Sequence, residues 1–132
     1  MKILITGCAG FIGFHLANKF LKEKIYVYGL DNLNNYYSVS LKKSRIKILK
    51  KEKKFNFKNI DISNRTKIKN FFKKHKFDVV IHLAAQAGIR YSLEKPYDYY
   101  DSNLTGFSNV IEESKNSNVK TFLFASSSSV YG

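Results

Sequence analysis

The chain has 132 residues, 44% of them hydrophobic and 15% aromatic, so it is long enough to bury the core of one domain and too apolar to be disordered. Its formal net charge is +13, yet of the 23 basic residues only Arg45, Arg65 and Arg90 are arginines. Many lysines gather in runs such as 50–54 and 73–76, at the expected ends of helices. We therefore expect a solvated lysine-rich surface and no nucleic-acid partner.

Two further features concern location and redox chemistry. Three apolar residues separate Lys2 from Thr6, and no apolar run approaches the length of a membrane span, so we expect a cytoplasmic protein with no membrane partner. The single cysteine, Cys8, has no second cysteine with which to form an internal disulfide. We expect neither a redox role for Cys8 nor a metal site.

The first thirteen residues contain the most informative pattern. Residues 3–6 are typical of a short buried strand, and the turn that follows leads directly into a helix on which Ile12, Leu16 and Phe20 recur every four residues. A helix N-terminus offers unpaired N–H groups and a partial positive charge, which attract phosphate. A turn without Cβ atoms lets the phosphate approach closely.

Three glycines shape this turn, and each has a separate expected role. Gly7 permits the tight bend, Gly10 the approach of a diphosphate, and Gly13 the close packing of the helix on the strand. This spacing, between a strand and a helix, predicts a dinucleotide-binding site. The alternative is a glycine-rich turn that binds no ligand.

A second strand is expected over residues 25–30, and Asp31 follows it directly. A carboxylate at this place accepts hydrogen bonds from the adenosine ribose hydroxyls and repels a phosphate at the 2′ position. The neighbouring Asn32 supplies no positive charge that would offset this repulsion. We therefore expect NAD rather than NADP as cofactor; the alternative is that Asp31 only initiates a turn.

Helices and strands continue to alternate along the chain. A helix is expected from a cap at Ser38 or Ser40 to about residue 51, followed by a strand over residues 55–60. The residues expected to face inward from this helix are Leu41, Ile46 and Leu49.

The next helix is expected to begin at Ser63 or Asn64, and a fourth strand to cover residues 79–82. The inward-facing residues of this helix are Ile68, Phe71 and Phe72. The strand ends at His82, which we interpret as a structural residue rather than a catalytic one. The small residues that follow would let a cofactor lie against the backbone.

A long helix over residues 97–116 is expected after Pro96, with Asn103 and Gly106 on its inner side, and a fifth strand over residues 120–125. Five strands alternating with helices predict an α/β protein with a doubly wound parallel sheet. In such a sheet the ligand lies at the carboxyl ends of the strands. A serine run follows the fifth strand, either as part of the site or simply as a polar strand end.

Polar or small residues thus recur where strands end, and Asn103 adds a polar residue on the inner side of a helix. The strings are Thr6-Gly7-x-x-Gly10-Phe-Ile-Gly13, Asp31-Asn-Leu, Asp61-Ile, Leu83-Ala-Ala, Asn103 and Ser126-Ser-Ser-Ser-Val-Tyr-Gly132. Together they resemble the NAD-dependent nucleotide-sugar epimerase and dehydratase family, the extended short-chain dehydrogenase/reductases, over the whole chain. The longer strings 31–37 and 84–94 are most similar to the UDP-glucuronate 4-epimerases.

The resemblance implies a Rossmann-type NAD-binding domain over residues 1–132 and assigns roles within it. The diphosphate would be held by Gly7, Gly10, Phe11, Ile12 and Gly13, the adenosine ribose by Asp31 and Asn32, and the adenine by Asp61 and Ile62. Leu83, Ala84 and Ala85 would line the cofactor, with Asn103 bracing the site. The UDP-sugar would meet Gln86, Arg90 and Ser127, although Arg90 is equally well explained as a surface arginine.

The resemblance also implies a mechanism. Hydride passes from the sugar C4 to NAD, and after the 4-keto sugar has turned over, hydride returns to its other face. Ser127 matches the family's active-site serine or threonine, and Ser129 a second hydroxyl often found beside it. The family's base is the tyrosine of a Tyr-x-x-x-Lys motif that lies beyond residue 132 in the family, and Tyr131 does not take this role, since it has no lysine four residues on.

We therefore expect this chain to be the N-terminal, cofactor-binding part of a longer homodimeric enzyme of polysaccharide biosynthesis. Alone, it should be inactive and should bind NAD weakly or not at all. Family members that eliminate water carry an Asp-Glu pair before Val-Tyr-Gly, and decarboxylases carry a glutamate, where this chain has Ser128 and Ser129. This favours 4-epimerisation of UDP-glucuronate. The alternatives are a UDP-glucose 4-epimerase, or a non-catalytic NAD-binding module or truncated product.

Overall fold

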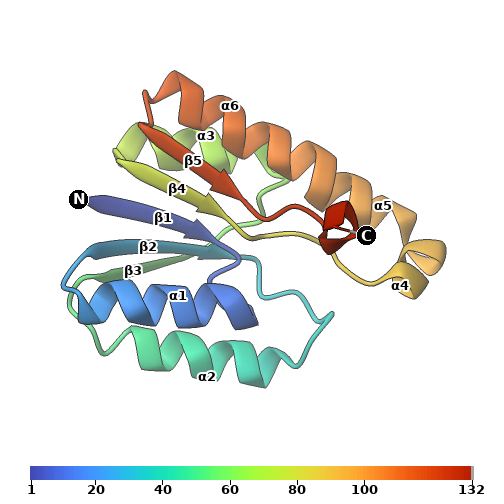
Figure 1. Cartoon of the computed structure of the whole chain (residues 1–132), viewed down its shortest axis with the longest axis horizontal. Helices are drawn as coiled ribbons and strands as arrows, with labels where there is room; N and C mark the ends of the chain where they lie inside the picture. The colour runs from blue at the N-terminus through green and yellow to red at the C-terminus, as the bar shows by residue number, and fades with distance from the viewer. Residues whose placement is uncertain (132) are drawn as a thin grey trace.

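The computed structural model describes residues 1–131, apart from the side chains of Ser128 and Ser129. Five parallel strands form one sheet in the order β3-β2-β1-β4-β5 (Figure 1). The strands are β1 (Lys2–Thr6), β2 (Tyr26–Asp31), β3 (Phe55–Asn59), β4 (Val79–His82) and β5 (Thr121–Phe124). The order reverses between β1 and β4, so the predicted doubly wound α/β fold is confirmed.

Two layers of helices cover the sheet. Helices α1 (Phe11–Lys22) and α2 (Val39–Leu49) lie on one face, and α3 (Arg65–Lys74) and α6 (Phe107–Asn116) on the other (Figure 1). Side chains of β1 alternate between the faces, because successive residues of a strand point in opposite directions. Ile3 and Ile5 therefore pack in the cluster beneath α1 and α2, while Leu4 packs in the cluster beneath α3 and α6.

The register of the sheet brings three strand ends together. Thr6, at the end of β1, pairs with Leu30 of β2 on one side and with His82 of β4 on the other. The segments that follow these three strands consequently leave the sheet from the same edge. This edge is where the sequence places its candidate site residues.

The helix caps and most inward-facing residues agree with expectation. Ser38 caps α2 by accepting a hydrogen bond from Leu41 N, and Asn64 caps α3 by accepting one from Lys67 N. One expected inward-facing residue is wrong, since Leu41 is 48% exposed, and Ile12, which begins the apolar repeat of α1, is 62% exposed. The buried row of α1 is instead Gly13, Ala17 and Leu21, because small residues there let the helix approach the sheet, and α2 buries Lys42 in place of Leu41.

The expected long helix after Pro96 is continuous but not uniform. It comprises α5 (Pro96–Tyr99), a π-helical segment η1 (Tyr100–Gly106) and then α6. Position 106 favours glycine, because a Cβ there would lie 2.6 Å from the Ile62 side chain. The chain also contains a 3-10 turn, η2 (Ser128–Tyr131), which the sequence did not indicate.

Helix α4 (Ile89–Glu94) was missed as well, because it buries no residue and so carries no apolar periodicity. Within residues 1–131, no helix combines the length and the apolar character that crossing a bilayer requires.

Candidate functional site

A cavity of about 390 Å³ opens at the carboxyl ends of β1, β2 and β4. It brings together most of the residues predicted to bind the cofactor. Those that line it are Gly7, Gly10, Phe11, Ile12, Gly13, Asp31, Asn32, Ile62, Leu83, Ala84 and Ala85. The exposure of Ile12 and Phe11 follows from this position, since both side chains stand at the start of α1 beside the cavity.

The glycine turn is shaped by contacts that exclude side chains. Gly7 has a φ of +71°, and a Cβ there would lie 2.8 Å from Ala84 N. A Cβ on Gly13 would lie 2.2 Å from Gly7 O. At Gly10 the nearest atom to a Cβ would be Gly7 O at 3.1 Å, with open space otherwise. Gly7 and Gly13 thus close the turn, while Gly10 keeps its outer surface bare.

Asp31 ties this turn to the end of β2. Its carboxylate is 8% exposed, with Oδ2 accepting a hydrogen bond from Ala9 N at 3.1 Å and Oδ1 accepting one from Leu33 N at 2.8 Å. The side chain therefore fixes backbone on both sides of the cavity. Each carboxylate oxygen has a second lone pair, which leaves acceptor capacity for a ligand hydroxyl.

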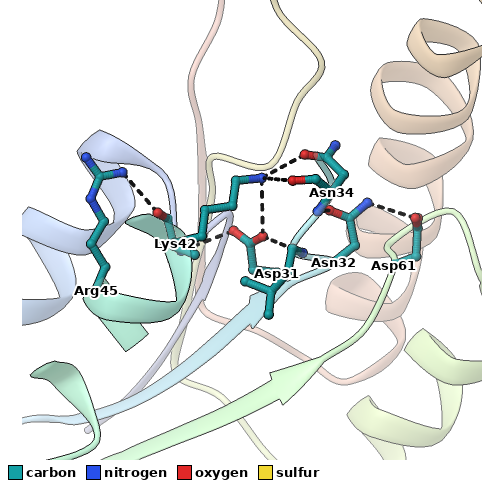
Figure 2. A network of polar contacts seen from close by, with 8 residues as sticks. Asp31, Asn32, Asn34, Lys42, Arg45 and Asp61 are labelled. Carbon is teal, nitrogen blue, oxygen red and sulfur yellow. Dashed lines mark hydrogen bonds and ion pairs between the residues drawn. The ribbon is translucent and has the colours of Figure 1, made fainter. Parts of the chain in front are cut away.

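A cation also lies beside Asp31, which the sequence analysis missed. Lys42 Nζ of α2 is 3.9 Å from Asp31 Oδ1 and lines the cavity (Figure 2). The sequence analysis considered only the neighbouring Asn32, which carries no charge, and so did not foresee this lysine. The available signal was the position of Lys42 on the inward row of α2, four and seven residues before Ile46 and Leu49.

A second cation from α2 supports the glycine turn. Arg45 donates a hydrogen bond to Ala9 O at 3.1 Å (Figure 2), and its guanidinium lies about 6.0 Å from the centre of the Phe11 ring. Both backbone groups of Ala9 are therefore held, the N–H by Asp31 and the carbonyl by Arg45.

Asp61 and Ile62 continue the site beyond β3. Asn32 donates a hydrogen bond to Asp61 Oδ2 at 2.9 Å, and the Ser63 N–H and hydroxyl both donate to Asp61 Oδ1. Burial raises the pKa of Asp61, but the hydrogen bonds from Asn32 and Ser63 and the charge of Lys67 outweigh it, so the pKa is below its usual value. Asp61 lines a smaller hollow that adjoins Asn32.

Asn103 braces the segment that follows β4. Its side chain accepts a hydrogen bond from Gln86 N at 2.8 Å and donates one to Gln86 O at 2.9 Å. Gln86 is 5% exposed and lines the cavity. This pair of bonds holds the backbone after Ala85 against η1.

Three predicted residues are less closely tied to the cavity. Ser127 follows β5 and is exposed, two residues after Ala125, which lines the cavity. The side chain of Ser129 lies outside the described residues. Arg90 is exposed on α4 and does not line the cavity.

Comparison with known proteins decides the family. The model of the NAD dependent epimerase/dehydratase family matches residues 3–132. This chain belongs to that family. NAD is the family's cofactor, which confirms the cofactor predicted from the glycine turn and Asp31.

Relatives in the epimerase/dehydratase family match the chain over almost its whole length. It is 52% identical over 132 residues to Protein CapI of Staphylococcus aureus, covering 100% of this chain and 39% of that protein. It is 48% identical to a UDP-glucuronate 4-epimerase of Thermodesulfobacterium geofontis, covering 97% of this chain and 40% of that protein. The chain thus spans about two fifths of the length of these curated relatives.

Solved structures of epimerases agree with the fold. The UDP-glucuronic acid 4-epimerase of Bacillus cereus, solved with UDP-glucuronic acid and NAD, matches with a TM-score of 0.88 and 37% identity, over 100% of this chain and 42% of that one. The UDP-Glc/GlcNAc 4-epimerase of Campylobacter jejuni matches with a TM-score of 0.87 and 35% identity, over 99% of this chain and 38% of that one.

Cys8, in the glycine turn, has the surroundings of a structural residue. Cys8 is buried, and burial, followed by the charge of Asp31, raises the pKa of its thiol, which keeps it protonated. Among residues 1–131, no group of three or more metal-ligating side chains is assembled.

His82 is held by Thr6. Thr6 Oγ1 lies 2.9 Å from His82 Nδ1 and accepts hydrogen bonds from Leu83 N and Ala84 N. Because the Thr6 oxygen already accepts these two hydrogen bonds, the Thr6 hydroxyl donates its own hydrogen to His82 Nδ1. Nδ1 is then the acceptor nitrogen of the neutral imidazole, and the ring proton lies on Nε2. Burial lowers the pKa of His82 from 6.5 to about 4.

We predict an acid destabilisation that originates at His82. Because the pKa is lower in the folded chain, protonation of the unfolded chain lowers the free energy of unfolding as pH falls from 6.5 to 4, by up to about 3 kcal/mol. Urea unfolding at several pH values will show a smaller decrease in His82→Gln than in wild type. The exposed His15→Gln serves as control; equal decreases in both variants would contradict the assignment.

Proposed function

We propose that this chain is the cofactor-binding part of an NAD-dependent nucleotide-sugar 4-epimerase that acts on UDP-glucuronate. The observation that carries the proposal is the match of the whole chain, with a TM-score of 0.88, to an enzyme solved with UDP-glucuronic acid and NAD. The cavity at the strand ends has the bare backbone turn and buried carboxylate that a dinucleotide requires.

Successive groups of residues along the cavity match successive parts of the NAD molecule. The N–H groups at the start of α1, beside Gly10, would hold the diphosphate, and Asp31 with Asn32 the adenosine ribose. Asp61 and Ile62 would bound the adenine, and the chain after β4, from Leu83 to Ala85, would lie along the remainder. When bound, NAD supplies the hydride acceptor for oxidation of the sugar alcohol.

The residues proposed for the sugar perform supporting chemistry. Ser127 would donate a hydrogen bond to the sugar oxygen that becomes a carbonyl, with Ser129, Gln86 and Arg90 completing the substrate contacts. A serine hydroxyl is too weakly acidic at neutral pH to act as the base by itself. Tyr91 and Lys95 have the Tyr-x-x-x-Lys spacing, but Tyr91 donates a hydrogen bond to Asp98, which raises the pKa of its phenol and makes it a poor base. The family's tyrosine base is therefore expected in residues outside this chain. Serines at 128 and 129 supply no carboxylate for elimination, which favours epimerisation.

Two alternatives rest on particular observations. A UDP-glucose 4-epimerase is supported by the TM-score of 0.87 with the Campylobacter jejuni enzyme. A non-catalytic NAD-binding module or a truncated product is the other alternative, because the described cavity assembles the residues proposed for the cofactor without the family's tyrosine base. A homodimer, a cytoplasmic location and the absence of a nucleic-acid partner stay predictions.

The substrate proposal is tested with the complete gene product and NAD. We expect NMR to show conversion of UDP-glucuronate to its 4-epimer faster than conversion of UDP-glucose. Ser127→Ala should lower kcat roughly 10²-fold or more, because a donor to the developing oxyanion is lost, while the α2 surface variant Ser44→Ala keeps wild-type kcat. Turnover of UDP-glucose alone, or release of a keto or decarboxylated sugar, would contradict the proposal.

Cofactor choice is tested at Asp31. Calorimetry on the complete gene product should show NAD binding at least about tenfold tighter than NADP, since a buried carboxylate repels the 2′-phosphate. Asp31→Asn should reduce the ratio of NAD affinity to NADP affinity, whereas Asp78→Asn, at the opposite end of the sheet, should leave this ratio unchanged. Equal affinity of the wild type for NAD and NADP would remove the argument.

A further inference from the structure

Lys42 is a buried lysine beside the proposed adenosine site. It is 6% exposed, and it lies on the same row of α2 as the buried Ile46 and Leu49. A charged ammonium in such a position is unfavourable unless other groups compensate for the lost water. Its compensating partners therefore indicate what the residue does.

The polar partners of Lys42 lie at the end of β2 and in the turn that follows, and the centre of the Tyr37 ring lies 5.8 Å from its ammonium. Lys42 Nζ donates to Asn34 Oδ1 at 2.7 Å and to Asn34 O at 3.1 Å, and it lies 3.9 Å from Asp31 Oδ1 (Figure 2). The side chain thus satisfies two carbonyl oxygens of one residue and offsets the charge of the buried carboxylate. Figure 2 shows it reaching from α2 across to this turn.

The turn of residues 31–34 contains an unfavourable backbone conformation, which its hydrogen bonds stabilise. Leu33 has a φ of +53°, a conformation that is unfavourable for a residue with a branched side chain. Asp31 Oδ1 accepts a hydrogen bond from Leu33 N, and Asn32 Oδ1 accepts one from Asn34 N at 3.1 Å. Lys42 holds the far side of the same turn through Asn34.

The turn also determines where the ribose acceptors stand. With Asn32 Oδ1 bonded to Asn34 N, Asn32 Nδ2 is directed at Asp61 Oδ2, 2.9 Å away. A continuous set of polar contacts therefore runs from Lys42 through Asn34 and Asn32 to Asp61 (Figure 2). Moving Asn34 would displace Asn32 and weaken the geometry around Asp31.

We propose that Lys42 is a positioning residue that holds the turn of residues 31–34 in the form that binds the hydroxyls of the adenosine ribose. The inference rests on the NAD site proposed above. Without the ammonium, both Asn34 oxygens lose their donor and Asp31 loses its nearby cation. The turn then relaxes from the unfavourable conformation at Leu33, and Asp31 no longer presents its free lone pairs to the ribose.

The test compares two ligands that differ only in these hydroxyls, ADP and 2′,3′-dideoxy-ADP. Both are titrated by calorimetry into the nucleotide-free complete gene product. Wild type should bind ADP at least about tenfold more tightly than 2′,3′-dideoxy-ADP. This ratio of affinities is the value expected for a hydrogen bond to a charged acceptor. Lys42→Met should reduce this ratio to less than about threefold. Lys42→Arg, which can donate to both Asn34 oxygens, should restore part of it.

The control is Lys43→Met, which removes an exposed lysine from the same helix and should keep the wild-type ratio. A Lys42→Met protein that binds both ligands more weakly but with the wild-type ratio would overturn the inference and leave the NAD site intact. A wild type that does not distinguish the ligands would overturn the ribose site itself. If Lys42→Met does not fold, Asn34→Ala replaces it, and an unchanged ratio there overturns the inference.

Discussion

The close contact between the turn after β1 and the backbone after β4 is the constraint on which the site depends. A side chain on Gly7 would lie 2.8 Å from Ala84 N and 2.9 Å from Leu83 O, so the two segments meet backbone to backbone. Thr6 reinforces this contact, because its hydroxyl accepts hydrogen bonds from Leu83 N and Ala84 N. The cavity lies beside this junction, where the glycine turn contributes Gly7 and Gly10 and the segment after β4 contributes Leu83, Ala84 and Ala85.

The other wall of the cavity is held by charge. Asp31 connects the glycine turn, through Ala9 N, with the turn after β2, through Leu33 N. Helix α2 supports both turns with cations one helical turn apart, Lys42 on Asn34 O and Arg45 on Ala9 O. The two turns that would contact the diphosphate and the ribose are therefore fixed relative to each other by the protein before any ligand binds, which lowers the ordering cost of binding.

The sequence predicted the parts of this structure that depend on local pattern. Strand ends, helix caps among the serines and asparagines named, and the need for glycine at positions 7 and 13 follow from spacing along the chain. It failed where a contact joins distant elements or lacks periodicity. Lys42 was overlooked because a lysine on an inward row is explained only by the carboxylate of another element, and α4 was missed because it buries nothing. Ile12 has the spacing of a core residue, but it faces the cavity instead of the sheet.

The central claim is that the bare surface of the glycine turn binds the diphosphate of NAD, and Gly10→Ala tests it most directly. Gly10 has a φ of −68°, which alanine adopts readily, and the nearest atom to an added Cβ is Gly7 O at 3.1 Å. Gly7 O must move by a few tenths of an ångström to admit the methyl group, so the free energy of unfolding should fall by only about 1 kcal/mol. Calorimetry on the complete gene product should nevertheless show NAD affinity reduced by about tenfold or more, because the methyl group holds the anion away from the α1 N–H groups. A stable Gly10→Ala protein that binds NAD as tightly as wild type would contradict the account.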